Sequence, residues 1–165
     1  ELSVRGDTQE QADANLNLVS LGQRQEGKLL ALFVDAPREQ LRGMSPSGRF
    51  VIDVPARLAV TLDSHNGDVR ATGVAGTFVA ETHNGEIVAE VAATNVKVET
   101  HNGDVELVLT SGGALQGELT THNGDVGITL PDGVDARFQA ATHNGRIVAP
   151  NGLSDVVANR RSVSG

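Results

Sequence analysis

Thr-His-Asn-Gly-Asp-Val, at residues 100–105, is the third of five copies of one motif. The His-Asn-Gly part is identical in all five copies, and every histidine of the chain belongs to it. Successive histidines are spaced by 18, 18, 21 and 21 residues, which places them at His65, His83, His101, His122 and His143. A fixed motif that returns at a nearly constant spacing indicates a repeat architecture.

The Asn-Gly pair of the motif predicts a tight turn, because Asn and Gly both tolerate positive φ. The same pair returns after each full repeat, whereas a series of hairpins would alternate two kinds of turn. We therefore expect five structural turns of one type, formed by Asn66, Gly67, Asn84, Gly85, Asn102, Gly103, Asn123, Gly124, Asn144 and Gly145.

The residues around each turn alternate between apolar and polar, which is the period of a β-strand. Counted from Asn as zero, positions −6, −4, −2, +3 and +5 are mostly apolar or Thr and should face inward. Positions −3, −1 and +2 should then face outward. In the third copy, the predicted inward set is Val96, Val98, Thr100, Val105 and Leu107.

These patterns predict an all-β fold, a single-domain β-solenoid (β-helix) with rungs of about 18–21 residues. Equivalent residues of neighbouring rungs would stack about 4.8 Å apart. The Asn column would then form a ladder of side-chain amides along one corner. An antiparallel meander is the competing architecture, since Asn-Gly also closes hairpins.

We expect one domain over residues 1–165, in three stretches. Residues 59–150 hold the five repeats, and residues 151–165 form a tail without an obvious closing rung, which leaves open whether the natural chain continues. Residues 1–58 lack the motif and are expected to form an irregular β cap. Their apolar stretches, read as opening strands, are Leu2–Val4, Leu16–Val19, Leu29–Val34 and Phe50–Val54.

The composition narrows the classes of partner. A formal net charge of −8 makes nucleic acids and anionic membranes unfavourable partners. The chain has no Cys, which excludes disulfides and thiolate zinc sites. No stretch approaches the roughly 18 apolar residues of a membrane-spanning helix. We expect no direct membrane span and no cofactor, apart from the weak divalent-metal option described below.

The recurring Thr-X-Asn-Gly-Asp-Val/Ile pattern resembles a bacterial adhesin-like family of β-strand repeat proteins, mostly of unknown function. The likeness extends to Val54-Pro55 before the first repeat, to Leu130-Pro131 before the last, and to both ends of the chain (Leu2–Gly6 and Asn159–Gly165). It implies an exported β-helix, often right-handed, that is periplasmic, on the cell surface or extracellular. It implies no catalytic residues. The family usually has a small polar residue where this chain has His.

The outward positions place a histidine ladder (His65, His83, His101, His122 and His143) beside a column of carboxylates at position −3. One hypothesis is a divalent metal site, for example for zinc, formed by His83, His101, Glu81 and Glu99. The alternative is a solvated stack of rings without a ligand. The ladder could also respond to pH, because histidine side chains commonly gain a proton near pH 6.5.

Two other motifs invite functional interpretations. The acidic column at position +2 could bind a cation such as Ca²⁺, or it could simply keep the surface soluble and unpaired. It comprises Asp68, Glu86, Asp104 and Asp125, and Arg146 interrupts it. The tripeptide Arg5-Gly6-Asp7 is one that integrins recognise, although three residues often match by chance.

Catalysis has little support, because the chain contains no nucleophile elbow, phosphate-binding loop or zinc-protease helix. We therefore expect a non-enzymatic structural or adhesion module of the envelope, or a secreted one, that acts through its repetitive surface. Its partner would be a protein or an envelope component, or a second copy. The alternatives are an envelope stress or ligand-sensing domain modulated by metal or pH, and a polysaccharide-active enzyme. The absence of Trp and Tyr disfavours the enzyme.

Overall fold

The structure is a computed structural model that describes residues 2–4, 19–35, 46–110, 115–132, 134, 136–149 and 156–160. All of its regular elements are β-strands, as the sequence predicts. No helix in these described stretches is long and apolar enough to cross a membrane. The chain divides into two compact units, residues 1–53 and 54–165, and each is described by itself. That they form a single domain stays a prediction.

The first unit contains two antiparallel strand pairs. Strand β1 (Leu2–Val4) pairs with β4 (Pro46–Gly48). Strand β2 (Ser20–Glu26) forms a hairpin with β3 (Leu29–Asp35). The hairpin reverses at Gly27, whose φ of 61° is a conformation that favours glycine.

The first unit matches the expected opening strands in part. Strands β1 and β3 fall on the predicted stretches Leu2–Val4 and Leu29–Val34. Residues Phe50–Val54, which were expected to be a strand, have no regular structure. Strand β2 was not predicted, because its sequence Ser-Leu-Gly-Gln-Arg-Gln-Glu has a single large apolar residue. The strand forms because its backbone pairs with β3, and the pattern of side chains does not predict this pairing.

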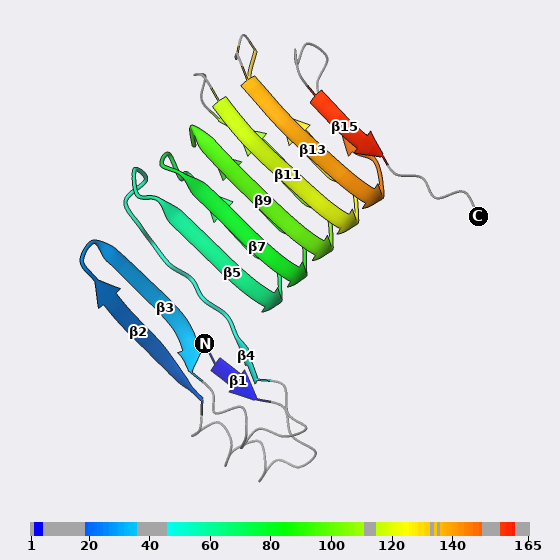
Figure 1. Cartoon of the computed structure of the whole chain (residues 1–165). Coiled ribbons are helices and arrows are strands. Elements are labelled where there is room, and N and C mark those ends of the chain that lie inside the picture. The colour runs from blue at the N-terminus through cyan, green and yellow to red at the C-terminus, as the bar shows by residue number, and fades with distance from the viewer. Residues whose placement is uncertain are drawn as a thin grey trace. The chain divides into compact units, whose positions relative to one another are not determined.

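The second unit is a β-solenoid made of two parallel sheets (Figure 1). Each rung contributes one strand to each sheet and turns between them at the Asn-Gly corner. The six-stranded sheet contains β5 (Val60–Asn66), β7 (Phe78–Asn84), β9 (Asn95–Asn102), β11 (Leu115–Asn123), β13 (Ala136–Asn144) and β15 (Val156–Arg160). The five-stranded sheet contains β6 (Val69–Thr72), β8 (Ile87–Val91), β10 (Val105–Leu109), β12 (Val126–Thr129) and β14 (Ile147–Val148).

Neighbouring rungs pair in parallel and in one register, which confirms the solenoid and excludes the antiparallel meander. Asn66 pairs with Asn84, and Asn84 pairs with Asn102. The first two repeats are 18 residues long and the next two are 21. Between Asn102 and Asn123, two of the three extra residues lie in the link between strands, since residues 92–94 link β8 to β9 whereas residues 110–114 link β10 to β11. The third lies in β11, which has 9 residues where β9 has 8.

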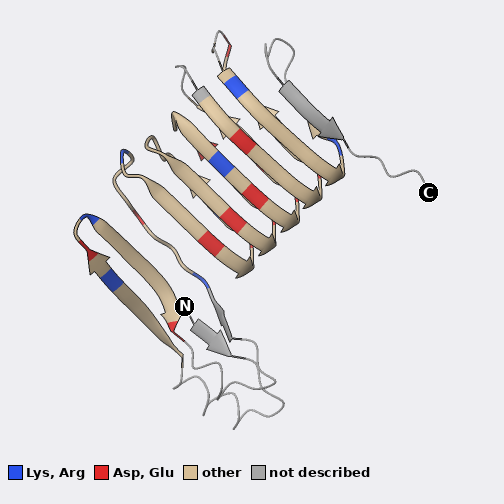
Figure 2. Cartoon of the chain, in the orientation of Figure 1, with Lys and Arg blue, Asp and Glu red and all other residues tan. Residues whose placement is uncertain are grey.

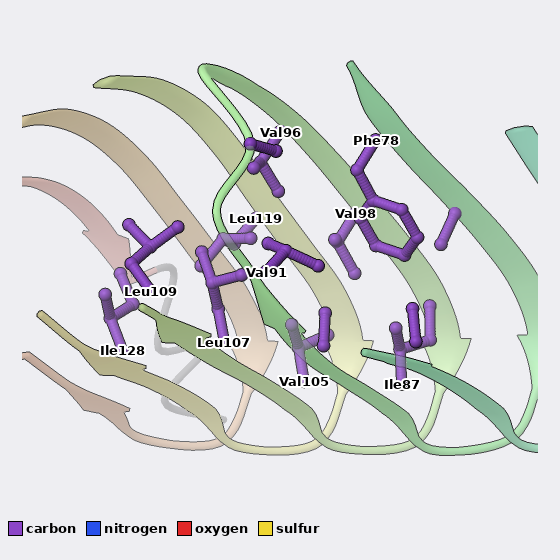
Figure 3. Packing of buried hydrophobic residues seen from close by; sticks show 14 of the residues in the cluster. Phe78, Ile87, Val91, Val96, Val98, Val105, Leu107, Leu109, Leu119 and Ile128 are labelled. Carbon is purple, nitrogen blue, oxygen red and sulfur yellow. The ribbon is translucent and has the colours of Figure 1, made fainter. Parts of the chain in front are cut away.

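The core fills the thin space between the two sheets with the predicted inward side chains (Figure 3). Phe78 and Phe138 are the largest fully buried side chains, and small residues such as Ala80 and Ala140 pack beside them. The buried threonines Thr82, Thr100, Thr121 and Thr142 lie where each strand reaches the corner. Val60 and Leu62 in the first repeat and Ile147 in the fifth are only partly buried, unlike the inward residues of the middle repeats.

The tail holds a strand that the sequence pattern does not predict. Strand β15 pairs in parallel with β13, so that Phe138 lies opposite Val156 and Thr142 opposite Arg160. This strand begins a sixth rung within the stretch expected to be a tail. The strand lacks the His-Asn-Gly motif, so the spacing of the motif does not indicate it.

Candidate functional site

The corners are held by one ladder of asparagine side chains. The Nδ2 group of each Asn donates to Oδ1 of the Asn in the preceding rung, from Asn84 to Asn144, at 2.7 to 2.8 Å. This confirms the predicted amide ladder. The φ values of Gly67, Gly85, Gly103 and Gly124 lie between 144° and 158°, whereas no described residue other than glycine has positive φ. Glycine alone therefore supplies the unusual backbone conformation of the turn.

The glycines are also required for close stacking. A Cβ atom built on Gly85, Gly103 or Gly124 would overlap the carbonyl oxygen of the glycine in the preceding rung. Gly67 has no preceding rung, and a Cβ atom there would meet nothing closer than the Ser64 hydroxyl at 3.6 Å. The stacked corners thus exclude side chains for a reason that the turn conformation alone does not give.

The buried threonines complete the corner. The Thr82, Thr100, Thr121 and Thr142 hydroxyls donate to the glycine carbonyl oxygens of the preceding rung, at 3.3, 3.1, 2.9 and 2.9 Å. A buried hydroxyl without a partner would be unfavourable, and these bonds satisfy it. The sequence predicted that these residues face inward but not that the hydroxyl would bind the next corner.

The acidic column at position +2 has a structural role that neither sequence hypothesis included. One carboxylate oxygen each of Asp68, Asp104 and Asp125 accepts a hydrogen bond from the backbone N–H of the +2 residue in the following rung, at 2.8 to 3.0 Å. Arg146 ends the column, and its guanidinium donates twice to the second Asp125 oxygen. The backbone N–H and then the side chain of Arg146 lower the pKa of Asp125. The calcium hypothesis stays a prediction.

The five histidine rings form a stack on the outer face of the six-stranded sheet, called here the His stack. Successive ring centroids lie 5.1, 4.8, 4.8 and 4.6 Å apart, and successive ring planes differ by 2° to 6°. The spacing follows the distance between strands, because the register places the rings directly above one another. Each ring lies at the end of its strand, directly before the Asn-Gly corner.

A carboxylate column formed by Asp63, Glu81 and Glu99 runs beside the His stack on β5, β7 and β9. Figure 2 shows acidic positions side by side on these three strands. The Nζ atom of Lys97 lies 3.2 Å from Glu81 Oε1 and 3.6 Å from Glu99 Oε2. The hydrogen bond to Glu81, followed by the charges of Glu81 and Glu99, raises the pKa of Lys97. Lys97 thus pairs with two of the three carboxylates, a pairing that sequence spacing alone did not indicate.

The His stack and the carboxylate column line a shallow groove that is open to solvent. The groove crosses the first four rungs and is bounded by the carboxylates on one side and by His65, His83, His101 and His122 on the other. It presents an imidazole and a carboxylate at each of the first three rungs, and Thr120 stands in place of the carboxylate at the fourth. Such a surface suits contact with an extended partner, whereas small-molecule sites are mostly enclosed and apolar.

The proposed metal ligands lie on neighbouring strands but do not converge. The rings of His83 and His101 are parallel to within 4°, so their in-plane lone pairs point in parallel directions rather than toward one ion. Glu81 and Glu99 are engaged by Lys97. Among the residues that the structure describes, no group of three or more His, Asp or Glu side chains is arranged to hold a metal ion. The tripeptide Arg5-Gly6-Asp7 lies outside the described residues.

Comparisons with known proteins identify the family but no better-studied relative. The search of curated proteins and the search of solved structures gave no match. The family model described as Toastrack DUF4097 matches residues 40–165, which include all five repeats. The family is named as one of unknown function, and the name carries no reference to adhesion. The chain therefore belongs to the Toastrack DUF4097 family.

Proposed function

We propose that this chain is a non-enzymatic structural or adhesion module, exported to the cell envelope or secreted, that acts through the outer face of its six-stranded sheet. The observation that carries the proposal is the open groove between the His stack and the carboxylate column. Its imidazole–carboxylate pair repeats over the first three rungs, so an extended partner can make the same contact three times. Repeated weak contacts of this kind add up to a useful affinity.

The charges of the face indicate the chemistry of the partner. The chain has a net charge of −8, and the groove is bordered by Asp63, Glu81 and Glu99. A neutral imidazole donates one hydrogen bond and accepts another, whereas ionised carboxylates accept hydrogen bonds and attract cations. The partner is therefore a protein or envelope component rich in amino or hydroxyl groups rather than a nucleic acid.

A co-sedimentation experiment with isolated bacterial envelope fragments tests the proposal. The first variant combines His83→Ser, His101→Ser and His122→Ser, which removes the centre of the His stack. The matched control combines Arg70→Ser, Glu90→Ser and Glu106→Ser, which are exposed positions on the five-stranded sheet. We expect wild type and control to sediment with the fragments and the histidine variant to stay in solution. Equal behaviour of the two variants, or no sedimentation of wild type, contradicts the proposal.

The enzyme alternative is tested separately with a panel of polysaccharides. We expect no cleavage by wild-type protein, because the described carboxylates beside the groove are spaced along one column and Lys97 forms ion pairs with two of them. Release of shortened product by wild type but not by a Glu81→Gln variant would overturn the non-enzymatic assignment.

The geometry of the His stack favours a second candidate function, a sensing domain that responds to pH. Protonation would place like charges about 5 Å apart along one edge, as the ring spacings require. Asp63, Glu81 and Glu99 face the stack and would soften the repulsion, while Lys97 would add to it. We expect a modest fall in melting temperature from pH 7 to pH 5, and a smaller fall in the triple histidine variant. An equal fall in both proteins would contradict this candidate.

A further inference from the structure

A second shallow groove crosses the outer face of the six-stranded sheet, in the half of the strands that is nearer to the loops. The outward side chains at positions −7 and −5 of four successive rungs line it, on or directly before β7, β9, β11 and β13. Lys97 lines this groove, and its Nζ atom pairs with Glu81 and Glu99 of the first groove, so the two grooves run side by side. The proposed role of the His stack makes no use of this second groove.

One column of this groove offers a hydrogen-bonding side chain at every rung. The column at position −7 consists of Thr77, Asn95, Gln116 and Arg137, which are all exposed. The register places Gln116 opposite Asn95 on one side and opposite Arg137 on the other. The corner ladder forms because every member is Asn, whereas four different side chains cannot repeat such a ladder. Together with Gln139 at position −5, these residues define what is called here the amide groove.

The charged residues of the amide groove alternate in sign. Lys97 on β9, Glu118 on β11 and Arg137 on β13 line it, and Figure 2 shows a basic, an acidic and a basic position on these three strands. Among the described outward-facing side chains that line the groove, Val79 alone is apolar. A surface of mixed sign gives little net attraction to a polyanion or a polycation, and an amphipathic helix needs a row of apolar contacts. The ligand that matches this groove is therefore neutral and rich in hydroxyl groups.

The spacing of the strands selects among neutral extended ligands. On this sheet, equivalent groups recur every 4.6 to 5.1 Å, as the His stack shows. An extended peptide advances about 3.3 Å per residue and presents the same side only at every second residue, so it falls out of step with the rungs. A sugar unit of a straight β-1,4-linked glycan is close in length to one strand spacing, and each unit carries neighbouring hydroxyls. Amide and guanidinium groups can bond two such hydroxyls at once, because each has several hydrogen-bonding atoms side by side.

We propose that the amide groove binds a neutral, straight β-1,4-linked glycan that lies across β7, β9, β11 and β13, with one sugar unit at each rung. Asn95, Gln116 and Gln139 bond its hydroxyls, and Arg137 contributes donors on β13. The chain has no Trp and no Tyr, so each sugar is held by hydrogen bonds rather than on an aromatic platform. Each contact is weak, and the affinity comes from several rungs that act together. The site is separate from the His stack and does not depend on the proposed envelope function.

NMR titration of the folded protein with cello-oligosaccharides and with N-acetylated chito-oligosaccharides tests the proposal. We expect shifts of backbone amides at the loop end of β7, β9, β11 and β13, and at least about tenfold tighter binding of a tetrasaccharide than of a disaccharide, since more rungs are engaged. Maltotetraose is the matched control, because its α-linked chain has similar hydroxyls but coils. It should bind at least about tenfold more weakly than the β-linked tetrasaccharides. No shifts with either β-linked series at millimolar concentration, or equal binding of maltotetraose, would overturn the proposal.

Variants of exposed residues locate the site. We expect Asn95→Ala combined with Gln116→Ala to weaken tetrasaccharide binding at least about tenfold, since two hydrogen-bonding positions are lost. The control pair Glu90→Ala and Glu106→Ala, exposed on the five-stranded sheet, should bind as wild type does. The triple histidine variant should also bind normally, and loss of binding there but not in the Asn95/Gln116 variant would place the glycan in the first groove and contradict the proposal. The shift map uses wild-type protein, so it locates the ligand even if a variant unfolds.

Discussion

Each rung of the solenoid has two ends, and the two are built differently. The corner end repeats Thr, Asn, Gly and an acidic residue almost without change, and each of these contacts the neighbouring rung. The loop end varies in length and in the size of the side chains beside it. Position −6, next to the loops, is Val60, Phe78, Val96, Gly117 and Phe138 in successive rungs. The contacts at the corner therefore fix the register between rungs, whereas the loop end tolerates differences in length and in side-chain size.

The largest effect is expected at a stacked corner glycine. In Gly103→Ala, the new Cβ would overlap the Gly85 carbonyl in addition to occupying an unfavourable φ of 155°. We expect a loss of about 3 kcal/mol or more in the free energy of unfolding. Gly67→Ala has a similar φ of 144° without the overlap, so it should lose only about 1–2 kcal/mol. Urea unfolding compares them, and equal losses would mean that turn conformation alone requires glycine.

At the loop end, a larger side chain should be tolerated better when the residue that faces it in the next rung becomes smaller. The Phe138 ring occupies the space that a side chain at Gly117 would fill. We expect Gly117→Ala to destabilise by about 1–3 kcal/mol through overpacking. Addition of Phe138→Leu should make the alanine less harmful than it is in the wild-type background. Strict additivity of the two substitutions would show that the residues do not share this space.

Two adjacent threonines allow the effect of losing the corner hydrogen bond to be distinguished from the general effect of replacing threonine by valine. Thr121 is 2% exposed and its hydroxyl donates to Gly103, whereas Thr120 is half-buried on the other side of the same strand. We expect Thr121→Val to lose about 1–1.5 kcal/mol in the free energy of unfolding. Thr120→Val should stay within about 0.5 kcal/mol of wild type. Similar losses in the two variants would argue against a role for the hydroxyl.

Lengthening a loop should matter less than either corner change. Insertion of Gly-Ser-Gly after Ala93 would convert an 18-residue repeat into one of 21 residues, a length that the chain already uses. Since loop-closure entropy rises slowly with length, we expect a loss of about 0.6 kcal/mol. Thermal unfolding measures it. A loss as large as that of Gly103→Ala would mean that the loop end is as constrained as the corner.

The smallest effect is expected at the end of the acidic column. The lowered pKa of Asp125 means that its ionised form favours the folded state. Its contribution is present above the ordinary Asp pKa of about 3.9 and disappears as the pH falls through the lowered folded-state value. Titration followed by NMR should find the Asp125 pKa still below its ordinary value in Arg146→Ala, because the backbone N–H remains. A complete return to the ordinary value would assign the whole effect to the guanidinium.

The sequence predicted the parts of the fold that local periodicity controls. Alternation at period 2 identified the inward residues, and the spacing of Asn-Gly identified the corners and the parallel stacking. Strands β2, β4 and β15 were missed, because none shows strong alternation or the motif, and each forms by pairing with another strand. Prediction of the candidate site was less complete, since Lys97 reaches its carboxylates across rungs that are far apart in sequence.

The amino-acid sequence by itself determined that the chain coils, which residues face the core, and that five histidines share one outer face. These features follow from the alternation and the spacing of side chains along the chain, which can be read directly from the sequence. Only the tertiary structure decided which groups neighbouring rungs supply to each other: the glycine carbonyl for Thr, the Asp oxygen for a backbone N–H, and the Asn carbonyl for a glycine N–H. These contacts depend on residues 15 to 21 positions apart meeting in register.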